Sequence, residues 1–159
     1  MPRQLLSEQS LGVEGFVGLV RAHATATRSL NAQLSADHGL TISDYEVLLR
    51  LAGAPERRLR RVDLAEQVLL TASGITRLLD GLEQQGWVER GACDGDRRVV
   101  YAVLTDAGLA KLREARSTHI PQIEAHFGRV LTPEELAILV ELLGKLEGAG
   151  DEPPCDPDA

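Results

Sequence analysis

The sequence predicts a mainly α-helical fold with one small β-hairpin, and three observations support this prediction. Apolar residues recur at helical spacing over most of the 159-residue chain. In residues 87–104 the pattern changes to β-branched and aromatic residues around the turn-forming stretch GACDGD, which is typical of a hairpin. Two short helices precede this hairpin, and long helices lie at both ends. This order predicts a winged helix-turn-helix, with the hairpin as wing, flanked by N- and C-terminal dimerisation helices.

Composition excludes several classes of protein. Of the 159 residues, 43% are apolar and only 3% aromatic, so the core has to be built from Leu, Val, Ile and Ala. No stretch approaches the roughly 18 uninterrupted apolar residues of a membrane span, and residues 1–10 lack the apolar segment of a secretion signal. The chain has two cysteines, Cys93 and Cys155, which are too few for a fold stabilised by a disulfide framework. We therefore expect a cytoplasmic protein with no membrane partner.

The net charge of −7 is unevenly distributed along the chain. Residues 50–101 carry 9 cations and 8 anions, whereas residues 102–159 carry 5 cations and 11 anions. The acidity therefore lies in the C-terminal third, and the middle is locally balanced with clustered arginines. A negative net charge disfavours a nucleic-acid partner, but it does so less when the acidic residues lie away from the arginine-rich middle of the chain. Arginine outnumbers lysine 15 to 2, but a GC-rich genome produces the same bias, so the count alone indicates little.

An N-terminal helix is expected over residues 7–37, closed by Gly39. Its stripe has spacings of 3, 1, 3, 4, 3 and 4 residues: Phe16, Leu19, Val20, His23, Thr27, Leu30 and Leu34. A second helix is predicted in TISDYEVLLRLAG, where two alternative capping boxes begin at Ser43 and at Thr41. Its predicted inward-facing residues are Tyr45, Leu48, Leu49 and Ala52.

A short helix over residues 63–69 precedes a longer one that Thr71 caps and that ends at Gly86. Four apolar residues form the buried face of the longer helix: Ile75, Leu78, Leu79 and Leu82. Four polar residues at helical spacing form the opposite face: Ser73, Thr76, Arg77 and Asp80. The hairpin strands follow, at residues 87–90 and 98–104.

Two more helices are expected after the hairpin. Thr105 caps the first, which Pro121 should kink or break. The second begins at TPEE, residues 132–135, and has a stripe of four leucines: Leu136, Leu139, Leu143 and Leu146. Because nothing else in the chain covers the terminal helices, they predict a second copy as partner. The predicted dimer interface comprises apolar residues from both ends: Phe16, Leu19, Leu30, Ile120, Ile123, Phe127, Leu139 and Leu143.

The expected organisation has four parts. Residues 1–40 form an N-terminal dimerisation helix, residues 41–104 the winged helix-turn-helix lobe, and residues 105–147 the C-terminal dimerisation helices. Residues 148–159, which hold two glycines, three prolines and four acidic residues, are expected to be a disordered tail.

The segment RRVDLAEQVLLTASGITRLLDGLEQQGWVERGACDGDRRVVYAVLTDAG resembles the MarR family of bacterial transcription regulators. The resemblance is dense over residues 59–108 and extends in layout over residues 7–147; its most specific part is the Asp-x-Arg wing followed by a Val/Leu strand and LTDAG. It implies a homodimer that binds a palindromic double-stranded DNA operator, usually as a repressor. Many family members are released by small aromatic or phenolic ligands, and some by thiol oxidation.

The resemblance and the chemistry of the residues indicate the same DNA-binding positions. The predicted recognition helix presents small hydrogen-bonding residues, a glycine for close backbone approach and an arginine able to read guanine: Thr71, Ser73, Gly74, Thr76 and Arg77. In the wing, arginine suits the negative potential of the minor groove, and by resemblance an aspartate orients it: Asp96, Arg97 and Arg98. Arg60 and Arg61 are weaker candidates, for phosphate contacts; a solvated basic loop explains them equally well.

The sequence leaves the effector and several alternatives open. His23 interrupts the first stripe and Tyr45 begins the second helix, so both are candidates for an effector cleft, or simply for core or interface. Cys93 in the wing keeps a redox-responsive regulator open, and the four histidines keep a zinc-responsive one open, although their spacing predicts no metal site. A winged-helix protein-interaction module is a further alternative. The sequence has no Gly-rich phosphate loop, HExxH or GxSxG, so we expect no enzyme, no catalytic residues and no cofactor.

Overall fold

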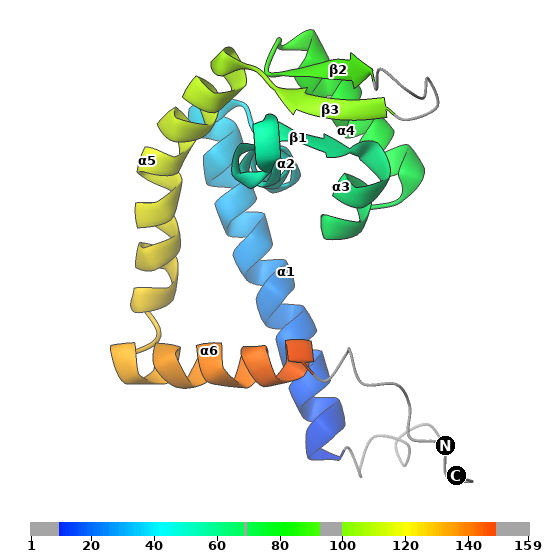
Figure 1. Ribbon diagram of the computed structural model, residues 1–159. Coiled ribbons are helices and arrows are strands. Elements are labelled where there is room, and N and C mark those ends of the chain that lie inside the picture. The colour runs from blue at the N-terminus through cyan, green and yellow to red at the C-terminus, as the bar shows by residue number, and fades with distance from the viewer. Residues whose placement is uncertain (1–9, 69, 93–99, 149–159) are drawn as a thin grey trace, which may run out of the picture. The chain divides into compact units, whose positions relative to one another are not determined.

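The computed structural model describes residues 10–68, 70–92 and 100–148 and confirms the predicted fold class (Figure 1). In this part of the chain there are six α-helices and a three-stranded antiparallel sheet. The chain divides into two compact units, Met1–Ile120 and Pro121–Ala159. The helix-turn-helix and the sheet both belong to the first unit.

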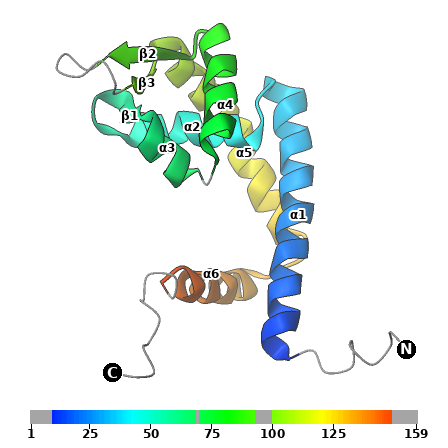
Figure 2. The same ribbon diagram turned by 90° about the vertical axis from the view of Figure 1, so that its right-hand side faces the viewer.

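Helix α1, Leu11–His38, is the long N-terminal helix (Figure 2). The Ser10 side chain caps it by accepting a backbone hydrogen bond from the first turn, and Gly39 ends it in the left-handed conformation at φ 67°. The predicted start at residue 7 lies outside the described residues. Two residues in the C-terminal half of α1, Leu30 and Leu34, are buried within the chain.

Helix α2, Ile42–Gly53, begins with the second of the two predicted capping boxes. Thr41 Oγ1 accepts from the Asp44 N–H at 3.1 Å, and Asp44 Oδ2 accepts from the Thr41 N–H at 2.8 Å. The prediction that Leu49 faces inward is wrong, because Leu49 is 39% exposed. Other helices and strands cover most of the circumference of α2, and Leu49 lies on the remaining side. The buried residues of α2 are Tyr45, Val47, Leu48 and Leu51.

The helix-turn-helix consists of α3, Arg61–Gln67, and α4, Ala72–Gln84. Thr71 caps α4 as predicted, and Gly86 follows the helix at φ 73°, where a side chain would add strain. Leu78, the predicted fourth residue of the buried face, is partly buried and packs against the same core. The buried residues of this face are Ile75, Leu79 and Leu82.

A three-stranded antiparallel sheet, in the order β1-β3-β2, lies beside these helices. Its strands are β1, Arg58–Arg60; β2, Val88–Ala92; and β3, Val100–Leu104. The pairing of β2 with β3 confirms the predicted hairpin. The sequence did not predict β1, because its Arg-Leu-Arg contains no apolar run and is a strand only through pairing with β3. Two residues with positive φ, Glu56 at 51° and Arg57 at 53°, lead the chain into β1.

Helix α5, Asp106–Gly128, extends from the first unit into the second. Thr105 Oγ1 accepts a hydrogen bond from the Gly108 N–H at 3.0 Å, which confirms the predicted cap. Pro121 lies inside the helix, so the proline does not break it. The helix therefore continues through Pro121, although this residue has no backbone N–H to donate.

Helix α6, Pro133–Gly148, begins with the predicted capping box. The Thr132 N–H donates to Glu135 Oε2 at 2.8 Å, and the Glu135 N–H donates to Thr132 Oγ1 at 3.3 Å. The stripe of α6 is only partly covered within the chain, and its last member, Leu146, is 61% exposed. Among the helices of the described residues, none is both long and apolar enough to cross a membrane.

The core of the first unit is aliphatic, as the composition predicts. It joins α1, α2, α3, α4, the sheet and the beginning of α5, and Tyr45 and Trp87 are the aromatic residues that pack with it. Its largest fully buried side chains are Leu34, Leu40, Leu48, Leu51, Leu64 and Val47. Because α4 contributes to this shared core, the orientation of its opposite face is fixed by packing.

Two glycines give opposite expectations for substitution by alanine. A Cβ at Gly108 would overlap the carbonyl oxygen of Trp87 and lie 2.7 Å from Leu104 Cδ1, so Gly108→Ala should lower the free energy of unfolding by about 2 kcal/mol. A Cβ at Gly81 in α4 meets no atom within 4 Å, so Gly81→Ala should raise it by about 0.5–1 kcal/mol. Urea denaturation measures both free energies of unfolding. A G108A variant as stable as the wild type would contradict the close approach of Gly108 to the Trp87 carbonyl oxygen.

Candidate nucleic-acid interface

The first turn of α4 is closed by Thr71. Its Oγ1 accepts a hydrogen bond from the Gly74 N–H at 3.1 Å and lies 3.2 Å from Ser73 Oγ. A Cβ at residue 74 would lie 3.2 Å from Thr71 Oγ1, so glycine allows the cap to close tightly. The exposed Ser73 hydroxyl therefore lies at a helix N-terminus, a position that favours phosphate.

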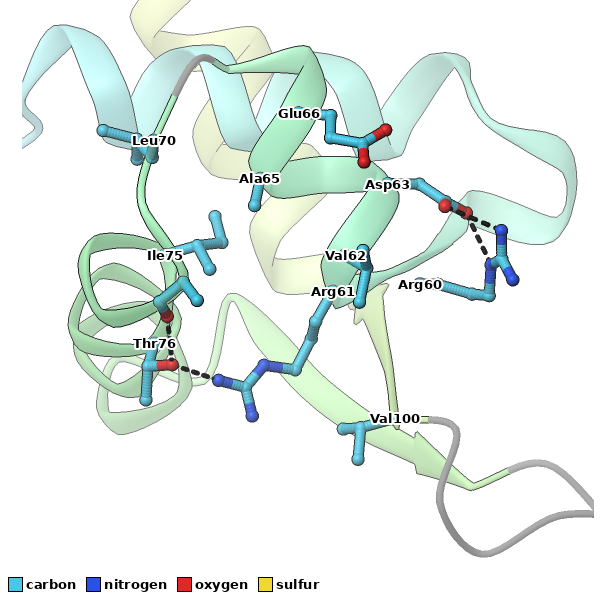
Figure 3. Close-up of a pocket in the computed structure, with 11 residues that line it drawn as sticks. Arg60, Arg61, Val62, Asp63, Ala65, Glu66, Leu70, Ile75, Thr76 and Val100 are labelled. Atoms are coloured by element: carbon cyan, nitrogen blue, oxygen red, sulfur yellow. Dashed lines mark hydrogen bonds and ion pairs between the residues drawn. The ribbon is translucent and has the colours of Figure 1, made fainter.

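Thr76 is one turn further along the polar face of α4, and its hydroxyl is engaged inside the protein (Figure 3). It donates to the Ala72 carbonyl oxygen at 2.7 Å and accepts a hydrogen bond from Arg61 Nη2. Arg61 therefore connects the start of α3 to α4. The hydroxyl is not free to read a base, and the Thr76 methyl group is the part that remains available for contact.

Arg77 differs from every other described arginine of residues 41–104. It is exposed and makes no hydrogen bond or ion pair with any residue that the structure describes. Each of the others has a partner: Arg50 with Glu46, Arg57 with Asp106, Arg58 with Glu56, Arg60 with Asp63, Arg61 with Thr76, and Arg90 with Asp80 and Glu83. The five guanidinium donors of Arg77 thus remain available to an external acceptor.

Arg60 is held in a two-pronged pair with Asp63. Its Nε and Nη2 each donate to a different carboxylate oxygen at 2.7 Å. This hydrogen bonding, together with the charge of Asp63, raises the pKa of Arg60 above its ordinary value. Arg57 and Arg58 have carboxylate partners too, so the arginines of residues 57–60 are internally neutralised, which lowers their attraction for phosphate.

Arg90 on β2 was not identified from the sequence. Its Nε lies 2.9 Å from both carboxylate oxygens of Glu83, and its Nη2 donates to Asp80 Oδ1 at 2.7 Å. These contacts raise the pKa of Arg90, with the Glu83 hydrogen bonds as the largest cause. The sequence contains no signal for this cluster, because it depends on how β2 lies beside the second half of α4.

The wing residues Asp96, Arg97 and Arg98 lie outside the described residues. The strands that flank them are paired up to Ala92 and Val100.

A cavity of about 520 Å³ lies between α3, α4 and the beginning of β3 (Figure 3). Its lining is part apolar and part charged and includes Arg61, Val62, Leu70, Ile75, Thr76 and Val100. This volume is in the range of small-molecule sites. Neither His23 nor Tyr45, the predicted candidates for an effector cleft, lines it.

Tyr45 and His119 form a buried polar cluster between α2 and α5. Tyr45 is 7% exposed and His119 4%, and their ring centroids lie 4.9 Å apart at an interplanar angle of 65°. The Tyr45 hydroxyl and His119 Nδ1 have no hydrogen-bond partner among the described residues. His38 Nε2 lies 2.6 Å from the hydroxyl Oγ1 of Thr118, the residue before His119 in α5. His23 is exposed on α1.

Metal ligation finds no support among the described residues. No group of three or more His, Cys, Asp or Glu in residues 10–68, 70–92 and 100–148 is arranged to hold an ion. Cys93, the residue that kept a redox-responsive regulator open, lies outside the described residues, and so does Cys155.

The fold and the outward polar face of α4 define the class of protein, a winged helix-turn-helix DNA-binding protein. Residues 38–99 match the family model described as MarR family. The regulator MhqR of Bacillus subtilis is 29% identical over 141 residues, covering 89% of this chain and 93% of that protein. Among solved structures, Sco3205 of Streptomyces coelicolor, a MarR family regulator in complex with DNA, has a TM-score of 0.80 at 29% identity, with 94% of each chain covered.

A second structure from the same organism, the MarR family regulator AbsC, has a TM-score of 0.72 at 30% identity, covering 89% of this chain and 96% of that chain. The chain belongs to the MarR family of transcriptional regulators. It is a DNA-binding regulator and not an enzyme.

His119 gives an expectation for the pH dependence of stability. Burial, and next the charge of nearby His38, lower the pKa of His119 below its ordinary value of 6.5. Between the lowered pKa and about 6.5, the unfolded chain binds more protons than the folded one, so acid favours unfolding. His119 therefore does not lower the free energy of unfolding above about pH 7. It lowers this free energy progressively as the pH drops below about 6.5.

Urea denaturation between about pH 5 and 8 measures this dependence. His119→Gln should flatten it, whereas His23→Gln, which removes an exposed histidine from α1, should leave it as in the wild type. Equal pH dependence in H119Q and the wild type would show that His119 is not responsible.

Proposed function

We propose that the protein is a homodimeric repressor that binds a palindromic DNA operator and is released by a small aromatic or phenolic ligand. Each subunit places α4 in the major groove of one half-site, and the wing reaches the adjacent minor groove. The observation that carries this proposal is Arg77, an exposed arginine without an internal partner among the described residues, on the outward face of α4.

The proposed contacts from α4 divide by chemistry. Ser73 and the backbone of the first turn suit phosphate, the Arg77 guanidinium suits guanine, and the Thr76 methyl suits a thymine methyl. Thr71 and Gly74 shape the turn that comes closest to the backbone of the duplex. The wing would contribute Asp96, Arg97 and Arg98, while Arg60 and Arg61 would contribute weakly because both have internal partners.

Exposed apolar side chains at both ends of the chain support the dimer. Phe16 is 67% exposed and Leu19 43%, and four residues of α6 are more than half exposed: Ile138, Val140, Leu142 and Leu146. Apolar surface of this extent favours burial against a partner, and a second copy supplies one by symmetry. Leu30 is 7% exposed within one chain, so it would support α1 from inside the subunit. The remaining proposed interface residues are Ile120, Ile123, Phe127, Leu139 and Leu143.

The resemblance to the family supports repression and release by an aromatic ligand. The buried Tyr45 hydroxyl has no partner among the described residues, and a polar group left in this state favours any ligand that supplies one. His23 is exposed on α1, so it would line a cleft only together with other parts of the dimer. Such a ligand must bind the free and DNA-bound forms with different affinity in order to release the operator.

Fluorescence anisotropy tests the proposal. The purified protein is titrated into labelled intergenic DNA flanking its own gene, and into a scrambled duplex of equal length, at near-physiological salt. A preference of about 10³-fold or more for the native fragment is expected of a sequence-specific regulator. Equal and weak binding to both, with and without aromatic ligands, would contradict the proposal. The same assay then screens for ligands that release the DNA.

Arg77→Ala should weaken binding to the preferred duplex by about 1–3 kcal/mol for each half-site, because a two-pronged contact to guanine would be lost. Binding to the scrambled duplex should change much less. Arg50→Ala is the matched control, since Arg50 lies on α2, is 48% exposed in its side chain and pairs with Glu46 at 3.3 Å. Operator affinity that is equal in R77A and R50A would remove Arg77 from the interface.

Phe16→Asp should convert the dimer to monomers, because it places a charge on an apolar surface that the second copy would cover. Phe16 is 67% exposed in one chain, so the subunit itself should remain folded. Val62→Asp, at a residue of α3 that is 69% exposed, is the control and should leave the dimer intact. Sedimentation velocity measures the masses, and a dimeric F16D would place the interface elsewhere.

A further inference from the structure

We propose that Arg90 is a positioning residue for DNA recognition: it holds the Asp80 carboxylate on the β2 side of α4, and so keeps Asp80 from pairing with Arg77. This inference rests on the proposed role of Arg77 in binding DNA. Arg90 is not itself proposed to touch the duplex.

The geometry of the cluster gives Arg90 two carboxylates at once. Its Nε lies 2.9 Å from both oxygens of Glu83, and its Nη2 donates to Asp80 Oδ1 at 2.7 Å. The Asp80 side chain is 45% exposed and that of Glu83 25%. Two anions on the recognition helix are therefore bound by one cation from the neighbouring strand.

Asp80 lies three residues after Arg77 in α4 and on the same polar face. Residues at this spacing are neighbours on a helix surface, close enough for an aspartate and an arginine to pair. In the structure Asp80 contacts Arg90, and Arg77 has no partner among the described residues. Without Arg90, the nearest cation along the helix for Asp80 would be Arg77. A guanidinium paired in this way would have to be released before it could bind a base.

Glu83 supplies an internal comparison. It lies six residues after Arg77, which is not a neighbouring position on the helix surface. Loss of Arg90 would leave both Asp80 and Glu83 without their cation, but only Asp80 would be placed to hold Arg77. Removal of one carboxylate or the other therefore separates specific competition from general repulsion of phosphate by two uncompensated anions.

The test measures affinity by fluorescence anisotropy on the duplex that the wild-type protein selects from a random-sequence library. Arg90→Met should weaken binding about fivefold, because a pair at this helical spacing would have to be broken in both subunits. Adding Asp80→Asn to R90M should restore affinity to within about twofold of the wild type, and adding Glu83→Gln should not. Arg90→Lys should stay near the wild type, since the ammonium group keeps the charge beside Asp80.

Two controls separate the alternatives. Arg50→Met removes the same charge from another exposed ion pair of the lobe and should leave affinity unchanged. The slope of affinity against salt should be the same in R90M and the wild type, whereas loss of a phosphate contact by Arg90 would reduce it by about 0.9 for each subunit. In the free protein, the Arg77 Nε–Hε NMR resonance should shift in R90M and return in R90M/D80N.

The inference is overturned if R90M binds as tightly as the wild type, if D80N fails to restore R90M, or if D80N and E83Q restore it equally. If instead the proposed function is wrong, the results differ from these: no duplex is selected from the library, or R77A binds DNA as tightly as the wild type. A loss in R77A without a loss in R90M therefore rejects the role of Arg90 and leaves that of Arg77 standing.

Discussion

Burial of one face of α4 is the constraint on which the rest of the interface depends. Ile75, Leu79 and Leu82 insert into a core shared with α1, α2 and the sheet, so the helix cannot rotate without exposing them. The opposite face, with Ser73 and Arg77, is consequently fixed outward. A recognition helix needs this rigidity, because base contacts depend on angles as well as distances.

Ion pairing then decides which arginines remain available. The lobe is rich in arginine, but carboxylates of the same chain pair with Arg57, Arg58, Arg60 and Arg90. The electrostatic attraction for DNA is correspondingly modest over this part of the chain. The described arginines of residues 41–104 that have no carboxylate partner are Arg61, which donates to the Thr76 hydroxyl, and Arg77 on α4. Such an arrangement favours contacts to base edges over nonspecific contacts to the phosphate backbone.

Local signals in the sequence predicted the helices, their caps and the hairpin, because capping boxes and helical stripes act over a few residues. Thr71, Gly39 and the TPEE motif are examples. Strand β1 could not be predicted, since it exists only through pairing with β3, some 40 residues later. Leu49 was misplaced for a related reason: the side of α2 that stays open depends on which elements surround it. The polar face of α4 was visible from its spacing, but the partners of Arg61 and Arg90 were set by tertiary structure.

Hydroxyl-radical footprinting on the preferred duplex tests the central claim most directly, since it reports how the protein lies on DNA. The account predicts two protected half-sites related by a dyad, with centres about one helical turn, 10–10.5 base pairs, apart on one face of the duplex. Protection of a single half-site, or uniform protection without a dyad, would contradict a dimer that inserts one α4 into each of two major grooves.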